Sequence, residues 1–267
     1  MGARSVSPSF ANGFAPRDGL SANPGLWDGL VGAWVPSLGV TGLTLFDVSR
    51  GSNNGTLTSM DPATDWVMSE KGWALDFDGS DDNVLLPTDG GLLNVLRTAP
   101  HSFVLNFKSR SLSGNQRIFA HSETSAGLRQ NVLWTQASAI GFTWDPSTGK
   151  AGKSTSFTDT SEWHSLIGVL EDSATISAYL DGVPMTGTTS RGSPDGLTYL
   201  GQSAGGTARF NGQIGVFLIY SRILTFPEIQ TLYVDPLAPF RLARRTLVGV
   251  AAAPGGTILP QMMQLSS

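Results

Sequence analysis

Four aspartates in a short stretch form the densest group of potential metal ligands in the sequence: Asp76, Asp78, Asp81 and Asp82. Calcium prefers carboxylate and carbonyl oxygens and takes about six to eight of them. If the chain is extended here, Asp76 and Asp78 share a face, because side chains alternate along a strand. Two interpretations stay open: a calcium site, or an ordinary acidic turn in which Asp78 and Gly79 supply the bend.

The patterns that would indicate catalysis are weak. The stretch Gly201-Gln202-Ser203-Ala204-Gly205 has the spacing of a nucleophile elbow, but that motif needs a strand, a turn and a helix, and a later histidine. The last histidine is His164, which precedes this serine. A glycan hydrolase needs two neighbouring carboxylates, and none of the five glutamates lies in a Glu-x-Asp-x-x-Glu pattern. We therefore expect no catalytic residue and no enzymatic activity.

Two tryptophans, Trp134 and Trp144, end neighbouring predicted strands. Aromatic rings stack on sugar rings and anchor protein partners. Both residues are therefore candidate contacts for a glycan or a partner on a concave surface, and the alternative is that they are packed in the core. Trp163 is interpreted as a core residue, and the adjacent His164 as structural.

Short apolar or alternating runs, separated by turn residues, follow one another from residue 30 onward. Such runs are typical of a β-sandwich or barrel. The predicted strands cover residues 30–35, 43–48, 73–77, 84–87, 102–107, 117–121, 131–135, 140–144, 163–170, 174–180, 197–201 and 213–220. Asp181 and Gly182 lie between alternating segments and predict a hairpin, because both tolerate the positive φ of a two-residue turn.

One helix is predicted, beginning after Thr225. Thr225 and Glu228 have the spacing of a capping box, in which each side chain accepts a free amide hydrogen of the other residue. An apolar stripe at i, i+3 and i+4 follows, and Pro236 ends the helix.

The composition also favours strands and turns, with 14% charged residues, 32 glycines and 15 prolines. A net charge of −4 argues against a nucleic-acid partner. The chain has no cysteine, which excludes disulfides and thiolate chemistry. We find neither a signal-peptide pattern nor an apolar run of about 20 residues, so we expect no export by the usual signal and no membrane insertion.

The two ends of the sequence differ from the middle in composition and residue pattern. This difference predicts an extended arm over 1–29, a sandwich over 30–235 and a second arm over 236–267. The arms carry the candidate assembly residues Phe10, Phe14, Trp27, Phe240, Arg241, Arg244 and Arg245. The second arm has no acidic residue, which suggests docking on an acidic neighbour such as another copy. The alternatives are a first arm that covers its own sandwich and a second arm that is merely solvated.

Four segments, in order, carry a family resemblance. They are Leu30-Val31-Gly32-Ala33-Trp34 with Asn53-Asn54-Gly55, then Ala74-Leu75-Asp76-Phe77 through Val84, then Trp163-His164 through Asp181-Gly182, and last Phe210-Asn211-Gly212 through Glu228-Ile229. Together they resemble the laminin-G-like jelly-roll family, relatives of pentraxins and concanavalin A-like lectins. The resemblance covers roughly residues 30–235 and implies an all-β sandwich of two antiparallel sheets with a curved concave face. In relatives, the loop around residues 76–82 can neighbour a calcium site. The family often has an Asp-Glu pair where this chain has Gly215 and Val216, which weakens the carry-over of an acidic site there.

This scaffold carries lectins, adhesins, hydrolases and structural proteins alike. We expect a non-enzymatic structural protein on the surface of a bacteriophage particle, either a capsid decoration or cement protein or a tail or fibre component. Its expected partners are the major capsid protein or tail proteins, further copies of itself, and a host surface glycan. No cofactor is required, and calcium is the one candidate. The alternative is a carbohydrate-binding adhesin or lectin module, and a glycan-active hydrolase ranks last.

Overall fold

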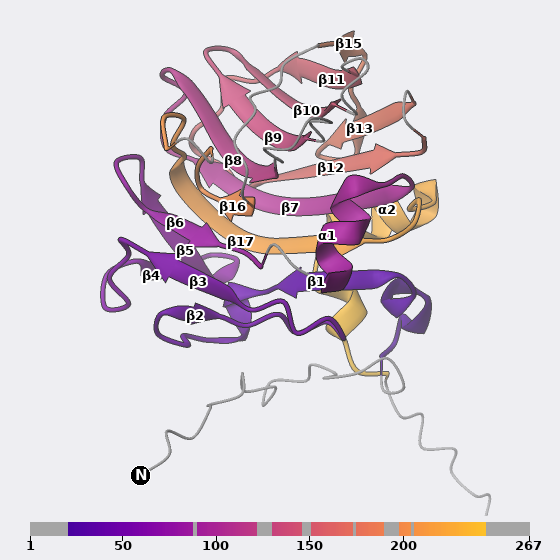
Figure 1. Ribbon diagram of the computed structural model, residues 1–267, viewed down its shortest axis with the longest axis horizontal. Helices are drawn as coiled ribbons and strands as arrows, with labels where there is room; N and C mark the ends of the chain where they lie inside the picture. Colours follow the sequence, from indigo (N-terminus) through magenta and orange to yellow (C-terminus); the bar gives the residue numbers. More distant parts are fainter. Residues whose placement is uncertain are drawn as a thin grey trace, which may run out of the picture.

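The computed structural model describes residues 21–87, 90–121, 130–145, 151–172, 175–189, 198–203 and 206–243. Two antiparallel sheets stack face to face, as Figure 1 shows. Among the described residues, one sheet has eight strands and the other has nine. The predicted all-β sandwich is therefore confirmed.

The eight-stranded sheet has the order β14 (Val183–Pro184), β13 (Ile176–Leu180), β12 (His164–Leu170), β7 (His101–Ser109), β17 (Asn211–Tyr220), β5 (Gly72–Asp78) and β4 (Trp66–Ser69), and β1 (Leu30–Trp34) also pairs with β17. The nine-stranded sheet has the order β15 (Gly187–Thr188), β11 (Ala151–Ser156), β10 (Ala139–Asp145), β9 (Gln130–Gln136), β8 (Asn115–His121), β16 (Thr198–Leu200), β6 (Asn83–Leu85), β3 (Gly55–Thr58) and β2 (Thr44–Leu45). Each predicted strand overlaps an observed one; β3, β4, β11, β14 and β15 are additional.

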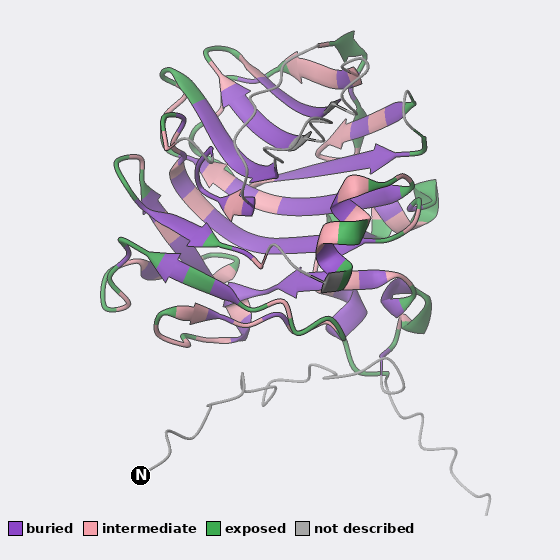
Figure 2. Ribbon diagram, viewed as in Figure 1, coloured by how far each residue is buried: buried purple, intermediate pink, exposed green. Residues whose placement is uncertain are grey.

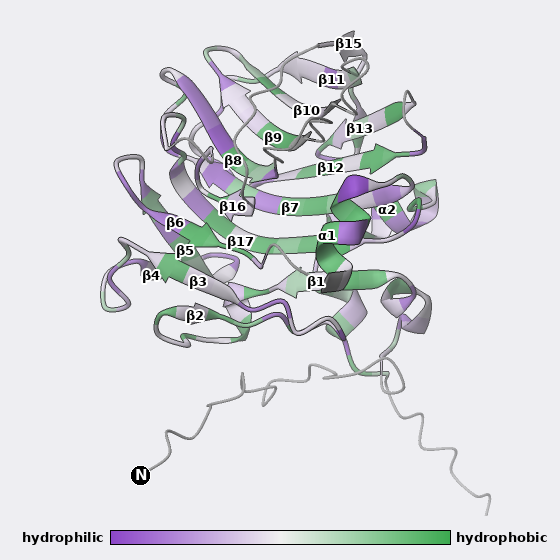
Figure 3. Cartoon of the chain, in the orientation of Figure 1, coloured by the Kyte–Doolittle hydropathy of each residue, from purple (hydrophilic) through white to green (hydrophobic). Residues whose placement is uncertain are grey.

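Hydrophobic cores lie on both faces of the eight-stranded sheet. Along β17, Phe217 and Ile219 face the core between the sheets, whereas Leu218 and Tyr220 face a second core on the outer side. We call this second cluster the outer core. Because β17 is buried on both faces, its sequence is a continuous apolar run rather than an alternating one. Figures 2 and 3 show the buried and the hydrophobic residues following the same central strands.

Two α-helices lie among the described residues, where the sequence predicted one. The predicted helix is α2 (Phe226–Val234), and its capping box between Thr225 and Glu228 is present. Its buried face packs into the outer core through Ile229 and Leu232. The additional helix is α1 (Gly90–Arg97), whose buried Leu92 and Leu96 join the core between the sheets. It was missed because a helix that opens with two glycines has a poor intrinsic propensity. In the described part of the chain, neither helix has the length and apolar character needed to cross a membrane.

The structure corrects the assignment of Trp27 and Phe240 to assembly arms. Trp27 lies in η2 (Pro24–Trp27) and Phe240 in η4 (Ala238–Phe240), and both side chains are buried in the outer core. Their rings meet edge to face at 5.4 Å, and Trp27 Nε1 donates to the carbonyl oxygen of Pro239 at 2.5 Å. Burying two large aromatic side chains is worth about 1.5–3 kcal/mol each, more than solvent-exposed arms would gain.

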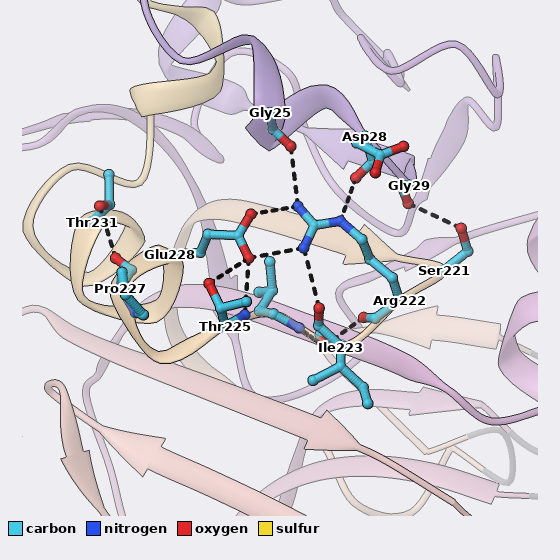
Figure 4. A network of polar contacts seen from close by, with 12 residues as sticks. Gly25, Asp28, Gly29, Ser221, Arg222, Ile223, Thr225, Pro227, Glu228 and Thr231 are labelled. Carbon is cyan, nitrogen blue, oxygen red and sulfur yellow. Dashed lines mark hydrogen bonds and ion pairs between the residues drawn. The ribbon is translucent and has the colours of Figure 1, made fainter.

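Arg222 fastens residues 25–28 to the body of the domain (Figure 4). Its guanidinium donates to the carbonyl oxygens of Gly25 at 3.1 Å and Asp28 at 2.7 Å, and forms a bidentate pair with Glu228 at 2.7 and 2.8 Å. Segments 21–29 and 236–243 are thus parts of the sandwich. Phe10, Phe14, Arg244 and Arg245 lie outside the described residues.

Candidate functional site

A groove of about 710 Å³ opens on the outer face of the eight-stranded sheet, where the outer core ends. Its floor comes from β7, β12 and β17. One wall is the segment that leads into β12, and the opposite wall is the end of α2 with the chain that follows it. We call this feature the Trp163 groove.

The floor is polar because two neighbouring strands, β7 and β12, change from apolar to polar at the same level. Outward-facing positions are apolar at Val104 on β7 and Ile167 on β12, and both belong to the outer core. Two residues further along each strand the outward positions are Asn106 and Ser165, which pair directly with each other. The apolar cover therefore stops on adjacent strands together, and the sheet presents polar side chains to the groove.

Trp163 forms one wall by packing its ring over the floor. A bulge between Ile214 and Val216 interrupts the pairing of β17 with β7 at Gly215. A Cβ atom on Gly215 would lie only 3.0 Å from Cζ3 of the Trp163 ring. Glycine at this position therefore lets the indole lie against the strand, and an acidic side chain there would displace it.

His164 is held between two carboxylates. Its Nδ1 lies 2.7 Å from Oδ2 of Asp181, and its Nε2 lies 3.6 Å from Oδ2 of Asp159. Oδ1 of Asp181 also accepts the backbone amide of Ser165 at 2.8 Å, so this carboxylate ties the hairpin turn to the floor. Hydrogen bonds from the backbone amide and hydroxyl of Ser161 lower the pKa of Asp159, which keeps it ionised.

The opposite wall carries an aromatic ring and an ion pair. Tyr233 is 39% exposed, and its ring packs against Gly182 of the hairpin turn. Arg241 forms an ion pair with Asp235, with its Nε 2.9 Å from Oδ2. The predicted assembly residue Arg241 is therefore engaged within its own domain, at the rim of the Trp163 groove.

Four polar atoms of the groove residues have no hydrogen-bond partner among the residues that the structure describes. They are Asn106 Oδ1, Trp163 Nε1, His164 Nε2 and Ser165 Oγ. A buried polar group without a partner costs about 1–3 kcal/mol, so such groups are rare in folded proteins. These four groups meet at one groove, so a ligand rich in hydrogen-bonding groups is the kind of partner that would satisfy them.

The predicted calcium ligands divide into two groups. Carboxylate oxygens of Asp78, Asp81 and Asp82 lie within 4.8 Å of one another, whereas Asp76 forms an ion pair with Arg110 and does not belong to this cluster. We call residues 78–82 the acidic turn. In this turn Oδ1 of Asp78 accepts the amide of Ser80 at 2.6 Å, and Oδ2 of Asp82 accepts the amide of Asp78 at 2.9 Å.

The pKa values of Asp82 and Asp78, in the acidic turn, shift in opposite directions. Burial raises the pKa of Asp82 to about 6, and the neighbouring Asp78 carboxylate adds to the shift. Burial also acts to raise the pKa of Asp78, but the amides of Ser80 and Asp81 that it accepts outweigh this and leave it below its usual value. The turn thus uses its carboxylates to hold its own backbone.

Trp134 and Trp144 point to opposite faces of the nine-stranded sheet and do not form a joint platform. Trp144 lies in the core between the sheets, where its ring meets His101 at 5.5 Å. Trp134 pairs with Gly141 on the outward face, and its ring lies over that glycine. Both side chains are only 2% exposed, so the prediction that they contact a glycan or partner is wrong for the structure as described.

The sequence contains few local signals of the groove. From the sequence, Trp163 and His164 are interpreted as structural, and neither Asn106 nor Ser165 is a candidate site residue. The signal that could have found them is a shared register. Outward positions on paired strands turn from apolar to polar together, but this is visible only when the pairing of β7 with β12 is known.

The two stacked sheets, with a helix and a polar groove on one outer face, define a lectin-like jelly-roll domain. A family model for the concanavalin A-like lectin/glucanases superfamily matches residues 78–230, which is more than half of the chain. The chain belongs to this family. A comparison with curated proteins found no match.

Solved structures share the fold at low sequence identity. A Trypanosoma rangeli sialidase in complex with the inhibitor DANA matches with a TM-score of 0.57 and 18% identity, over 78% of this chain and 33% of the sialidase. The same sialidase in complex with sialic acid matches with a TM-score of 0.57 and 17% identity over the same shares. The receptor binding domain of botulinum neurotoxin C/D mosaic serotype matches with a TM-score of 0.59 and 13% identity, over 78% of this chain and 51% of that chain. The chain therefore spans about a third of the sialidase and half of the toxin domain.

Proposed function

We propose that this chain is a non-enzymatic recognition domain that binds a saccharide in the Trp163 groove. The observation that carries the proposal is the group of four unpartnered polar atoms gathered around an indole ring. Saccharide sites combine an aromatic surface with a few fixed polar groups, because sugar rings offer both apolar faces and hydroxyls. The family and the likeness to a sialidase and a receptor-binding domain support this choice.

A binding role fits the groove better than catalysis does. Hydrolysis of a glycosidic bond needs one carboxyl to act as acid and another to act as base or nucleophile. Here Asp181 is occupied by His164 and by the backbone of Ser165. Asp159 is held ionised by Ser161, which suits an acceptor and not a proton donor.

A glycan array followed by calorimetry on the best binder tests the proposal. Trp163→Ala should weaken binding by roughly thirtyfold, the effect of removing an aromatic hot spot worth about 2 kcal/mol. Trp163→Phe should lose less, because it keeps a ring and removes only the indole N–H. Phe226→Ala is the matched control, since Phe226 is 55% exposed on α2 and lies outside the groove lining. Unchanged affinity in both Trp163 variants, or no binding to any glycan, would contradict the proposal.

We also propose that the domain is a structural component of a bacteriophage particle, held there by its flanking segments. Ser21 and Leu242 form an isolated antiparallel bridge, and the amide of Ala22 donates to the carbonyl oxygen of Arg241 at 2.7 Å. Figure 1 shows the indigo start and the yellow end of the described chain side by side at one edge of the domain. The two ends of the described chain thus meet at a single spot, which favours attachment of the domain by that edge to capsid or tail proteins or to further copies. Phe10, Phe14, Arg244 and Arg245 are the candidate assembly residues of the two flanking segments.

Quantitative mass spectrometry of purified particles tests the second proposal. The chain should be present in a fixed ratio to the coat protein, and deleting residues 1–20 or 244–267 should remove it from particles while the sandwich stays folded. Absence of the full chain from particles would contradict a virion role and leave the saccharide proposal untouched.

A further inference from the structure

We propose that the Trp163 groove selects uncharged saccharides and rejects those that carry a carboxylate or sulfate; this inference rests on the proposed function. The described lining carries four carboxylates (Asp159, Glu162, Asp181 and Asp235) and two cations (Lys71 and Arg241). Two positive and four negative charges give a formal balance of −2. An anionic ligand would therefore enter a groove of its own sign.

The two cations do not offset this balance. Proteins commonly bind carboxylate or sulfate through an arginine fork that donates two parallel hydrogen bonds. The fork of Arg241 is directed at Asp235, with Nε 2.9 Å from Oδ2 and Nη2 3.3 Å from Oδ1. Lys71 is exposed and has no such planar geometry. An incoming anion would have to take Arg241 from a carboxylate that already holds it.

The hydrogen-bonding groups of the groove also favour hydroxyls. Asn106 Oδ1 is an acceptor, Trp163 Nε1 is a donor, and the hydroxyl of Ser165 serves either way. A sugar hydroxyl can donate to Asn106 and accept from the indole. A carboxylate or sulfate can only accept, so it leaves Asn106 without a partner.

An array of matched glycan pairs tests the inference. Each pair holds a neutral oligosaccharide and the same oligosaccharide extended with sialic acid or sulfate. We expect the neutral member of a recognised pair to bind at least about tenfold more tightly than its anionic counterpart at low ionic strength, because like charges repel most strongly when salt does not screen them. Raising the salt from about 50 to about 300 mM should reduce this difference in affinity, because it strengthens binding of the anionic member.

The variant Glu162→Gln checks that charge is the cause. Glu162 is exposed, so its replacement preserves the fold, and it should narrow the difference in affinity by about threefold because it strengthens binding of the anionic member. The surface-charge control is Glu70→Gln. Glu70 lies outside the groove lining, so its replacement should leave the difference in affinity unchanged. Preferential binding of the anionic members would overturn the inference while the saccharide proposal stands. The same holds if the difference in affinity changes neither with salt nor in Glu162→Gln. Failure to bind any member of the array would instead overturn the proposed function.

Discussion

The acidic turn and the Trp163 groove both gather polar side chains, yet they treat those side chains in opposite ways. In the turn, Asp78 and Asp82 accept backbone amides of the same five-residue stretch. In the groove, side chains from three strands meet, and polar atoms of Asn106 and Ser165 remain without partners among the described residues. A dense run of chemically active residues is thus often a self-contained piece of local structure, whereas a site draws unsatisfied groups from distant parts of the chain.

The sharpest test of this contrast uses two buried serines on the outer side of the same sheet. Ser102 Oγ donates to the carbonyl oxygen of Arg222 at 2.8 Å and accepts the amide of Leu224 at 3.1 Å. Ser102→Ala should therefore lower the free energy of unfolding by about 2 kcal/mol, because it leaves two buried backbone groups unpaired. Ser165→Ala removes an unpartnered hydroxyl and should leave that free energy unchanged or raise it by up to about 1 kcal/mol.

Urea denaturation of the two serine variants gives the comparison, and glycan titration completes it. Ser165→Ala should bind its glycan more weakly while it gains stability. If both variants lost stability equally, the hydroxyl of Ser165 would have a partner within the protein. The polar side chains of the groove would then be satisfied internally, as those of the acidic turn are.

The second test removes a carboxylate from the acidic turn. Asp78→Ala should lower the free energy of unfolding by about 1–2 kcal/mol, because the amides of Ser80 and Asp81 lose their acceptor. Asp81→Ala is the matched control: Asp81 is exposed and no hydrogen bond of its carboxylate is found among the described residues, so its loss should change stability by less than about 0.5 kcal/mol. Saccharide binding should be unaffected in both variants. Loss of binding in Asp78→Ala, without loss of fold, would show that the turn belongs to the site.

The third test follows the titration of Asp82. Its pKa in the folded protein is about 6, raised from an ordinary value of 3.8. The folded state therefore binds this proton more tightly than the unfolded state, and the stability gained is fully present below pH 3.8 and lost as the pH rises through 6. Relative to Asp82→Asn, the native chain should lose stability between pH 4 and pH 7. Urea denaturation across this window measures the difference, and a constant difference would show that Asp82 titrates normally.

The smallest expected effect is that of calcium. Three carboxylates, of which Asp78 and Asp82 already serve backbone amides, supply few of the oxygens that a calcium ion needs. A dissociation constant of about 1 mM would give about 0.4 kcal/mol of stabilisation at 1 mM Ca²⁺. We therefore expect the melting temperature to shift by less than about 2 °C between EGTA and 1 mM Ca²⁺. A much larger shift that disappears in Asp78→Asn would establish a metal site and reverse the contrast between the two regions.

Much of the fold could be predicted because its signals are local. The turn at Asp181 and Gly182 has φ angles of 51° and 75°, as the two-residue hairpin requires. The capping box of α2 depends only on Thr225 and Glu228, three residues apart. By contrast, α1 lacks such local signals, because its helical state depends on burying Leu92 and Leu96 in a core built by both sheets.

The candidate site could not be predicted in the same way. Trp134 and Trp144 have the residue type of a sugar-binding platform, and only their burial shows that they do not form one. Trp27 and Phe240 are likewise predicted to be arm residues from the sequence. Only the tertiary structure shows that their rings contact each other. The same residue type serves a core or a surface, and its neighbours decide which.

The sequence by itself determined the class of fold, the turns and the cap of α2, because alternation, turn chemistry and capping act between residues a few positions apart. Only the tertiary structure decided which polar residues meet in the groove. The alignment of Asn106 with Ser165 is a property of strand register, and the room for the Trp163 ring comes from the bulge at Gly215. Register and bulges result from the packing of whole sheets against their cores, a balance of many weak contacts that no short stretch of sequence contains.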